Sequence, residues 1–175
     1  MMILRHILSI VILPFAVAVV VPAALLRAEP AADSTPAPTL GPVVALIGLM
    51  LVVYTIASFA YRGRGTLAPW DPPRRLVITG VYRHVRNPMI SGVILILAGE
   101  ALAFSSAAVG IWALMVFIVN AVYIPMVEEP GLARRFGAEY EEYSRHVPRW
   151  VPRLSPWHPA APRGPASEAE GRSGA

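Results

Sequence analysis

The chain has 175 residues, of which 55% are hydrophobic and only 15% are charged, and its mean hydropathy is +0.55. This composition is too apolar for an ordinary soluble domain of that length. Cysteine is absent and the four histidines are scattered, so disulfides, cysteine nucleophiles and a metal site are not expected. All 15 basic residues are arginines that gather at the ends of apolar runs, which favours membrane lipids over nucleic acid as the partner.

Four apolar runs predict four transmembrane helices. The runs cover residues 7–26, 40–61, 89–104 and 107–126. The first run contains Pro14 and Pro22, which a packed membrane helix tolerates. Arg5 before it and the small residues Ala28 and Ala31 after it also allow a cleaved signal peptide. Because the run is long for a signal sequence, we expect an uncleaved span.

The positions of the arginines predict the orientation of the helices. Nearly all of them lie in the N-terminus, in the connection at residues 62–87 and in the C-terminal tail. Arginine-rich flanks of membrane helices stay in the cytoplasm, and four spans place these three segments on the same side. Both termini are therefore expected to be cytoplasmic. The absence of lysine is typical of a genome rich in G and C, so we expect a bacterial inner membrane.

Two pairs of glycines predict close contact between helices. Gly41 and Gly48 share one face of the second span. Gly92 and Gly99 share one face of the third span with the same spacing of seven residues. Small residues at such positions let two helix backbones approach each other.

A tight helical hairpin is expected where Ser105 and Ser106 separate the third span from the fourth. Glu100 lies about five residues before this tip. An ionisable side chain inside a membrane helix is a candidate for function. At that depth the carboxylate can also simply reach the opposite interface, so both interpretations stay open.

An amphipathic helix is expected after the fourth span, within residues 128–153. Its apolar residues recur at spacings of four, four and three, which places them on one helix face. They are Leu132, Phe136, Tyr140 and Tyr143. Such a helix either lies on the cytoplasmic membrane surface or covers a cofactor site. Residues 154–175 are rich in Pro, Ala, Gly and Ser and are expected to be disordered, which leaves two N-terminal spans (1–61) and a core (62–153).

The sequence GVYRHVRNPMISG at residues 80–92 leads into the third span and is basic and aromatic. Pro88 fits the first turn of a helix, where its missing N–H is no loss. The free N–H groups of that turn, together with Arg83 and Arg86, favour the binding of an anion. Arginines beside a membrane helix can equally serve only to set the topology and to contact lipid phosphates.

Two blocks of sequence together resemble the isoprenylcysteine carboxyl methyltransferase family and its relatives, the membrane phospholipid methyltransferases. The first block is GVYRHVRNPMISG, and the second, EE…L…FG.EY..Y…VP, follows the fourth span. The resemblance covers residues 76–152. It implies that S-adenosylmethionine is held at the cytoplasmic ends of the helices, beneath the C-terminal segment. It also implies that a lipophilic acceptor enters from the bilayer.

The resemblance implies a set of site residues. Those that match the family's cofactor contacts are Leu76, Val77, Tyr82, Asn87, Pro88, Met89, Ile90 and Glu128. The carboxylate of Glu128 would pair with the positive charges of the cofactor, and Tyr82 would pack on its adenine. Arg86 and Glu129 are the expected catalytic residues. Arg86 would orient the cofactor carboxylate or an anionic acceptor, and Glu129 is, with His84, a candidate base.

Three positions depart from the family pattern. Asn87 stands in place of a histidine, and Ile90 stands in place of a tyrosine. Ile124 replaces the arginine that meets the substrate carboxylate in the carboxyl methyltransferases. These changes argue against a prenylcysteine carboxylate as the acceptor and affect cofactor binding less.

Taken together, the sequence predicts an all-α integral membrane protein with about four transmembrane helices. Its expected activity is the transfer of a methyl group from S-adenosylmethionine to a lipophilic acceptor. A related membrane reductase with a nicotinamide cofactor is the alternative enzyme, since a cluster of arginines would suit its phosphates. A non-enzymatic membrane scaffold that binds lipid is the alternative outside the enzymes. The identity of the acceptor and the oligomeric state are left open.

Overall fold

The computed structural model describes residues 14–28, 39–62 and 76–159, and within these ranges it contains helices and no strand. The expectation of an all-α fold is therefore confirmed for the described residues. The elements in chain order are the π-helix η1 (Ala16–Val20), α2 (Val21–Ala28), α3 (Leu40–Arg62), the 3₁₀-helix η2 (Gly80–Arg83), α4 (Pro88–Phe104), α5 (Ala107–Tyr123), the π-helix η3 (Ile124–Glu128), α6 (Glu129–Phe136) and α7 (Ala138–His146).

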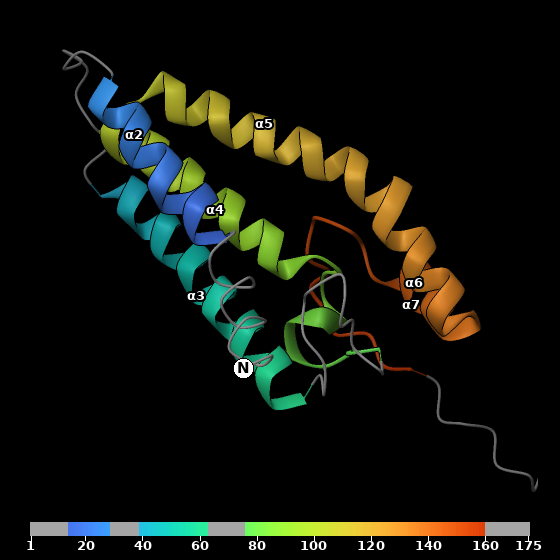
Figure 1. Cartoon of the computed structure of the whole chain (residues 1–175). Helices are drawn as coiled ribbons and strands as arrows, with labels where there is room; N and C mark the ends of the chain where they lie inside the picture. Colours follow the sequence, from blue (N-terminus) through green and yellow to red (C-terminus); the bar gives the residue numbers. More distant parts are fainter. Residues whose placement is uncertain (1–13, 29–38, 63–75, 160–175) are drawn as a thin grey trace, which may run out of the picture.

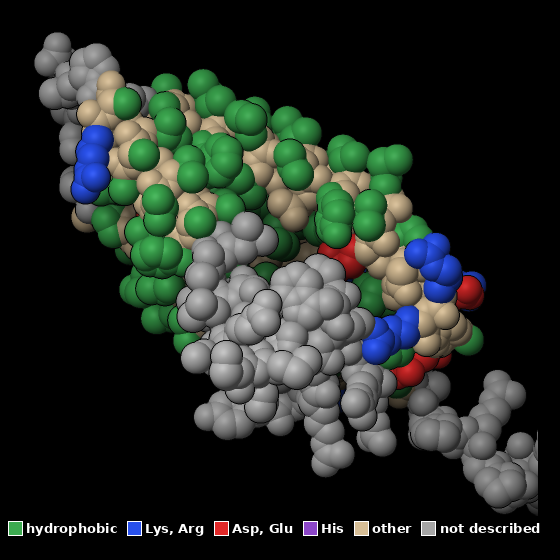
Figure 2. Space-filling view, in the orientation of Figure 1, with side chains coloured by type: hydrophobic (Ala, Val, Ile, Leu, Met, Phe, Trp, Pro, Cys, Tyr) green, Lys and Arg blue, Asp and Glu red, His purple; other side chains and the backbone are tan. Residues whose placement is uncertain are grey.

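Two helices are long and apolar enough to cross a membrane. They are Leu40–Ser58 within α3 and the continuous rod Ala107–Phe136 formed by α5, η3 and α6. Few of their residues are buried, and Figure 2 shows hydrophobic side chains spread over the outer face of the helices. A surrounding lipid bilayer explains why so much apolar surface is not packed against other parts of the protein. Helices Ala16–Ala28 and Pro88–Phe104 are apolar but shorter, so four spans remain a prediction, and residues 7–13 of the first run lie outside the described residues.

The helices form one elongated bundle in which α4 lies between α3 and α5, and η1 and α2 pack against α4 and α5 (Figure 1). Except for α2, each of these segments contributes to a single apolar cluster. Its buried members are Ala18, Val52, Val93, Leu97 and Ala113. The indole N–H of Trp112 in α5 also donates to the carbonyl oxygen of Val17 at 2.9 Å, which fixes the first described helix to the bundle.

The predicted glycine faces meet each other across the contact between α3 and α4. A Cβ atom at Gly48 would lie 2.5 Å from the carbonyl oxygen of Gly92, and one at Gly92 would lie 2.8 Å from that of Gly48. A Cβ atom at Gly99 would lie 2.6 Å from the carbonyl oxygen of Gly41. The two heptad-spaced pairs therefore oppose each other in antiparallel order, and the prediction of close helix contact is confirmed.

The expected hairpin tip is present between α4 and α5. Ser105 ends α4 in the left-handed conformation, with φ of 50°, and Ser106 caps α5 by accepting a hydrogen bond from the Val109 N–H at 3.1 Å. Such a cap satisfies one of the free N–H groups at the start of a helix. Glu100 lies one turn before this tip, and its Oε2 atom is buried without a hydrogen-bond partner among the described residues.

Two prolines are accommodated by widened turns, so the helices continue past them. Both η1 and η3 end two residues before a proline, Pro22 and Pro130 respectively. A proline ring collides with the carbonyl group four residues earlier, and a π turn, which bonds residues five apart, relieves that collision. The N–H of Glu129 accordingly donates to the carbonyl of Ile124. The fourth helix therefore does not stop at residue 126, where the expected span ends, but continues into α6 (Figure 1).

The expected single helix within residues 128–153 is broken in two. Gly137, with φ of 55° and ψ of −133°, ends α6 and begins α7, because this backbone conformation is open to glycine and not to other residues. The apolar side chains that were expected on one face still meet, in a cluster with the chain beyond α7. Its buried members are Ile78, Tyr140, Tyr143, Val147 and Trp157, with Leu132 and Phe136 packed against them.

The start of the expected disordered tail is docked. Residues 154–159 are described, and Trp157 is only 9% exposed because its ring lies against Tyr143 and is stacked on His146. These aromatic contacts bury Trp157 and so order a short stretch that was expected to be disordered from its Pro-rich composition. The rest of the tail, residues 160–175, lies outside the described residues.

Replacing Gly48 by Ala is expected to destabilise the bundle. The added methyl group would force α3 and α4 apart at the carbonyl of Gly92, at a cost of about 1–3 kcal/mol. Gly110→Ala is the matched control, since a Cβ atom at Gly110 would lie 3.9 Å from its nearest neighbour, the Cβ atom of Ala101. Thermal unfolding in detergent, followed by tryptophan fluorescence, should show a lower midpoint for Gly48→Ala alone. Equal midpoints for the two variants would contradict the close helix contact.

Candidate functional site: a carboxylate shared by two arginines

The polar end of the bundle is built from a basic loop (residues 76–87) and the extended chain after α7 (residues 147–159), which we call the C-terminal strap. Three backbone hydrogen bonds join the two segments. The carbonyl oxygen of Pro148 in the strap accepts a hydrogen bond from the N–H of Arg86 at 2.9 Å. The N–H groups of Arg153 and Trp157 donate to the loop carbonyls of His84 and Arg83, each at 3.0 Å. The strap therefore follows the loop along its length.

Tyr82 holds the basic loop between α3 and α7. Its side chain is 7% exposed and shares a hydrogen bond with Thr55 of α3. Its carbonyl oxygen accepts from the hydroxyl of Tyr143 in α7 at 2.7 Å. Burial raises the pKa of the Tyr82 hydroxyl, with smaller contributions from Tyr143 and from the charge of Glu128. Tyr82 therefore stays neutral, and Glu128 lies near enough for its charge to be felt there.

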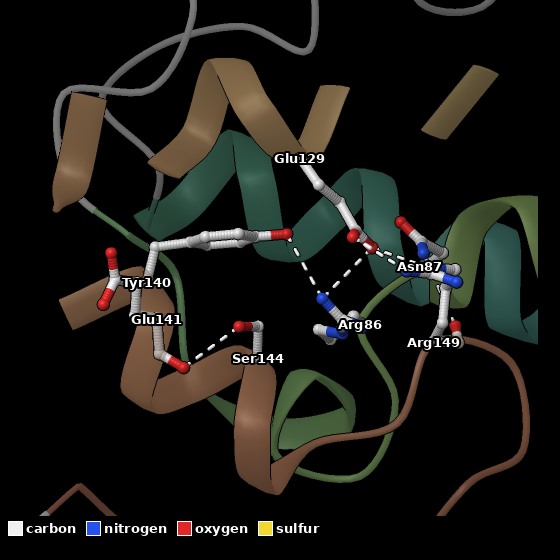
Figure 3. A network of polar contacts seen from close by, with 7 residues as sticks. All are labelled: Arg86, Asn87, Glu129, Tyr140, Glu141, Ser144 and Arg149. Atoms are coloured by element: carbon white, nitrogen blue, oxygen red, sulfur yellow. Dashed lines mark hydrogen bonds and ion pairs between the residues drawn. The ribbon is translucent and has the colours of Figure 1, made fainter. Parts of the chain in front are cut away.

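The centre of the site is the carboxylate of Glu129, the first residue of α6 (Figure 3). Arg149 of the strap binds it with two parallel hydrogen bonds, from Nε to Oε1 at 2.7 Å and from Nη2 to Oε2 at 2.8 Å. Arg86 of the basic loop approaches the same Oε1 atom with Nη1 at 3.1 Å. The paired side chains of Arg86 and Glu129 are only 11% and 17% exposed, so water screens their attraction weakly.

Two further residues complete the network in Figure 3. Arg86 Nη1 also donates to the hydroxyl of Tyr140 in α7 at 3.3 Å. The side-chain amide of Asn87 donates to the carbonyl oxygen of Arg149 at 3.5 Å. In this way the network connects the start of α4, the start of α6, α7 and the strap. An isolated pair on a surface would leave those four segments independent.

The network carries a net positive charge, because two guanidinium groups share one carboxylate. The hydrogen bond with Glu129 raises the pKa of Arg149 above its already high value, so this residue is always charged. Burial raises the pKa of the Tyr140 hydroxyl, and the negative charges of Glu129 and Glu128 raise it further. Tyr140 is therefore a neutral phenol whose oxygen accepts from Arg86 and whose proton remains available for donation.

One donor in the network is left over. The Nε atom of Arg86 is buried and has no hydrogen-bond partner among the described residues. Buried polar groups are nearly always paired, so an unpaired N–H on a guanidinium indicates a place where an anionic group can bind. The chemistry of Arg86 thus suits a carboxylate or a phosphate.

The structure brings together three of the site residues predicted from sequence, Arg86, Asn87 and Glu129. The others are not part of this network, and Tyr82 is buried in the basic loop as described above. Pro88 is buried in the first turn of α4. The remaining predicted residues are Leu76, Val77, Met89 and Ile90, which are half-buried, and Glu128, which is exposed. Leu76 packs against the aromatic cluster of the C-terminal strap, so its expected contact with the cofactor stays a prediction.

Two members of the network were not predicted as site residues. Tyr140 was expected only as part of an apolar helix face, and Arg149 was not considered at all. Their signal in the sequence is weak, since Arg149 follows the quoted Val-Pro pair and resembles any other arginine of the tail. His84, expected as a possible base, turns its Nδ1 atom to the carbonyl oxygen of Arg153 at 2.7 Å.

Replacing Glu129 by Gln is expected to loosen the C-terminal strap. The two guanidinium groups of Arg86 and Arg149 would then repel each other without the shared charge, at a cost of about 1–3 kcal/mol. Hydrogen exchange at the strap amides that bond to the loop should become about fivefold to a hundredfold faster, since 1.4 kcal/mol is a factor of ten.

Glu141→Gln is the matched control for this experiment. Glu141 also pairs with an arginine, Arg145, but at 3.6 Å and with side chains that are 59% and 74% exposed. Exposed pairs contribute about 0–1 kcal/mol, so exchange in the strap should stay unchanged. The same exchange rates in both variants would show that the Glu129 network does not hold the strap.

Comparison with known proteins identifies one family. The phospholipid methyltransferase family matches residues 37–139, from the start of α3 to the start of α7, and so covers more than half of the chain. The matched region contains Arg86 and Glu129 and ends before Arg149 and the strap. Neither the curated proteins nor the solved structures gave a match. The extent of the match, together with the apolar helices, places this chain in the phospholipid methyltransferase family of membrane methyltransferases.

Proposed function

We propose that the protein is an S-adenosylmethionine-dependent methyltransferase that acts on a lipophilic acceptor reaching it from the bilayer. The observation that carries this proposal is the position of Arg86. Its guanidinium is held by Glu129 and Tyr140 at the end of an apolar bundle, with one buried N–H left unpaired. A polar ligand bound there would lie next to the apolar helices, which is where a lipid-borne acceptor would arrive.

The residues at this end fit the charges of S-adenosylmethionine. The cofactor carries a carboxylate, an ammonium group and a sulfonium, and when bound it supplies a methyl group already activated for displacement. Arg86 Nε offers a buried donor for the carboxylate. Glu128 offers a carboxylate close to Tyr82 and Tyr140 for the positive groups. The protein would then mainly hold two substrates in line and exclude water.

The geometry assigns Glu129 a holding function in this proposal. Both of its oxygens accept hydrogen bonds from Arg149, and Oε1 also faces Arg86. A carboxylate surrounded in this way stays ionised and is a weak proton acceptor, so Glu129 acts by orienting Arg86. His84 is better suited as a base. Its Nδ1 faces the carbonyl of Arg153 and must carry the proton, which leaves Nε2 as the basic nitrogen.

We also propose four membrane spans with both termini in the cytoplasm, in a bacterial inner membrane. The basic loop, α6, α7 and the strap would then share the cytoplasmic side, and the hairpin tip at Ser105 would face the opposite side. This topology is supported by the arginines, which gather in the segments assigned to the cytoplasmic side.

The proposed acceptor class is supported by a different position. Ile124 is 1% exposed and supplies no cation where the related carboxyl methyltransferases bind a substrate carboxylate. The acceptor class therefore stays a lipophilic molecule without a required carboxylate.

Binding of S-adenosylmethionine to the detergent-purified protein tests this proposal. Wild type should bind, and Glu128→Gln and Arg86→Gln should each weaken the affinity about tenfold or more, because each removes a charged partner of the ligand. Glu141→Gln is the control and should bind as wild type does. Calorimetric titration measures all four proteins, and their thermal unfolding verifies that each is folded.

The outcomes separate the three functions that the sequence allows. Folded wild type that does not bind S-adenosylmethionine would contradict the methyltransferase. Binding of a nicotinamide dinucleotide in its place would identify the reductase, and binding of neither would leave the lipid-binding scaffold. If binding occurs, transfer of a labelled methyl group into membrane extracts would then identify the acceptor.

A further inference from the structure

The C-terminal strap has an apolar turn that no other part of the described structure covers. Val151 is 75% exposed and Leu154 is 101% exposed, which makes Leu154 the most exposed large hydrophobic side chain among the described residues. Both lie on the strap between the segments that bond to the basic loop. An isolated exposed apolar side chain is ordinary, so the position of this turn relative to the membrane helices decides its meaning.

Two neighbouring residues fix the turn along the rod of α5, η3 and α6. Arg149 bonds Glu129 at 2.7 Å, and the Trp150 ring lies 5.4 Å from the ring of Phe117. Phe117 precedes Glu129 by twelve residues, which is about 18 Å along a helix. The turn therefore lies beside the last turns of α5, and Figure 1 shows the segment after α7 rising towards α5 before it turns back.

That part of α5 faces lipid. It belongs to the rod that is long and apolar enough to cross a membrane, and the large side chains that flank Phe117 on the helix surface are exposed. They are Leu114 at 57%, one turn before Phe117, and Ile118 at 51%, next to it. Trp150, Val151 and Leu154 thus continue an apolar surface that already belongs to the bilayer. Because the turn continues this lipid-facing surface, lipid is the expected cover of its exposed side chains.

The basic loop holds the backbone at both ends of the turn. The carbonyls of Pro148 and Arg149 accept hydrogen bonds from the loop, and the Arg153 N–H donates to it. Pro152 has no N–H to satisfy. The backbone of the turn therefore suits the interfacial depth, where headgroups and water satisfy its remaining polar groups while its apolar side chains enter the acyl region.

The charges of the strap point the same way. Residues 147–159 contain Arg149 and Arg153 and no acidic residue. Arg153 directs its guanidinium back to the carbonyl of His146 at 3.0 Å, away from the tip. An apolar tip with a tryptophan, flanked by arginines that reach back to the interface, has the composition of a segment that dips into an anionic leaflet.

We propose that residues 150–154 form a membrane-inserted turn that places Val151 and Leu154 among the acyl chains of the leaflet at the polar end of the bundle. The inserted turn anchors the strap, and with it Arg149, to the lipid side of the site. This inference does not depend on the methyltransferase activity, since it concerns only what covers the turn. It also extends beyond the matched family region, which ends at residue 139.

Single cysteine variants test the proposal directly, because the natural chain has no cysteine to give a background label. Leu154→Cys and Val151→Cys carry a spin label, and the full chain is reconstituted in vesicles of equal parts phosphatidylcholine and phosphatidylglycerol. Collision with oxygen reports lipid, and collision with a water-soluble nickel chelate reports water. Val119→Cys on α5 is the lipid control, and Glu142→Cys on exposed α7 is the water control.

We expect the Leu154 and Val151 labels to match Val119, with an oxygen-to-nickel collision ratio several-fold above that of Glu142. A ratio equal to that of Glu142 would overturn the proposal, because the turn would then lie in water. Low collision rates with both reagents would also overturn it, since the turn would then be covered by another part of the chain. Both labelled residues are exposed, so neither substitution removes a packing contact on which folding depends.

Discussion

The polar end of this protein depends on one carboxylate shared by two arginines. Glu129 is approached at 2.7 Å by Arg149 and at 3.1 Å by Arg86, which come from segments more than sixty residues apart. Without the carboxylate these two cations would repel each other at short range in a partly buried place. With it, the basic loop, α6 and the C-terminal strap become one unit. The aromatic cluster of α7 and the strap stabilises this unit further by burying apolar surface, while the ion pairs determine how the segments are arranged.

The position of Glu129 depends in turn on how the long rod passes its prolines. The π turn η3 adds a residue to one turn of the helix just before Glu129. Each added residue rotates everything that follows by about 100° around the helix axis. The bulge therefore decides which side of the rod Glu129 faces, while the rod itself continues from the apolar region into the polar end. This explains how a helix that starts among apolar neighbours delivers a carboxylate to an arginine cluster.

The family match and the network overlap only in part. The phospholipid methyltransferase match contains Arg86 and Glu129, and it ends before the strap that carries Arg149. The cation that grips Glu129 with two hydrogen bonds thus comes from a segment beyond the matched region. The same segment touches Phe117 through Trp150, so it connects the site with the apolar surface of α5. We infer that this chain completes the site with its own C-terminal segment.

Local features were accessible from the sequence alone. The apolar runs, the glycine faces of α3 and α4 and the hairpin tip each depend on composition or spacing within about twenty residues. The candidate residues Arg86, Asn87 and Glu129 came from two blocks of sequence, and the structure places them in one network.

Contacts between distant segments were decided only by the tertiary structure. The choice of Arg149 as the partner of Glu129 depends on where the strap lies after Gly137 breaks the predicted helix. The burial of Trp157 depends on the aromatic side chains of α7, which a Pro-rich composition does not reveal. Periodicity and composition describe one segment at a time. Which arginine reaches a carboxylate, and which tail residue is covered, follows from the folding of segments against each other.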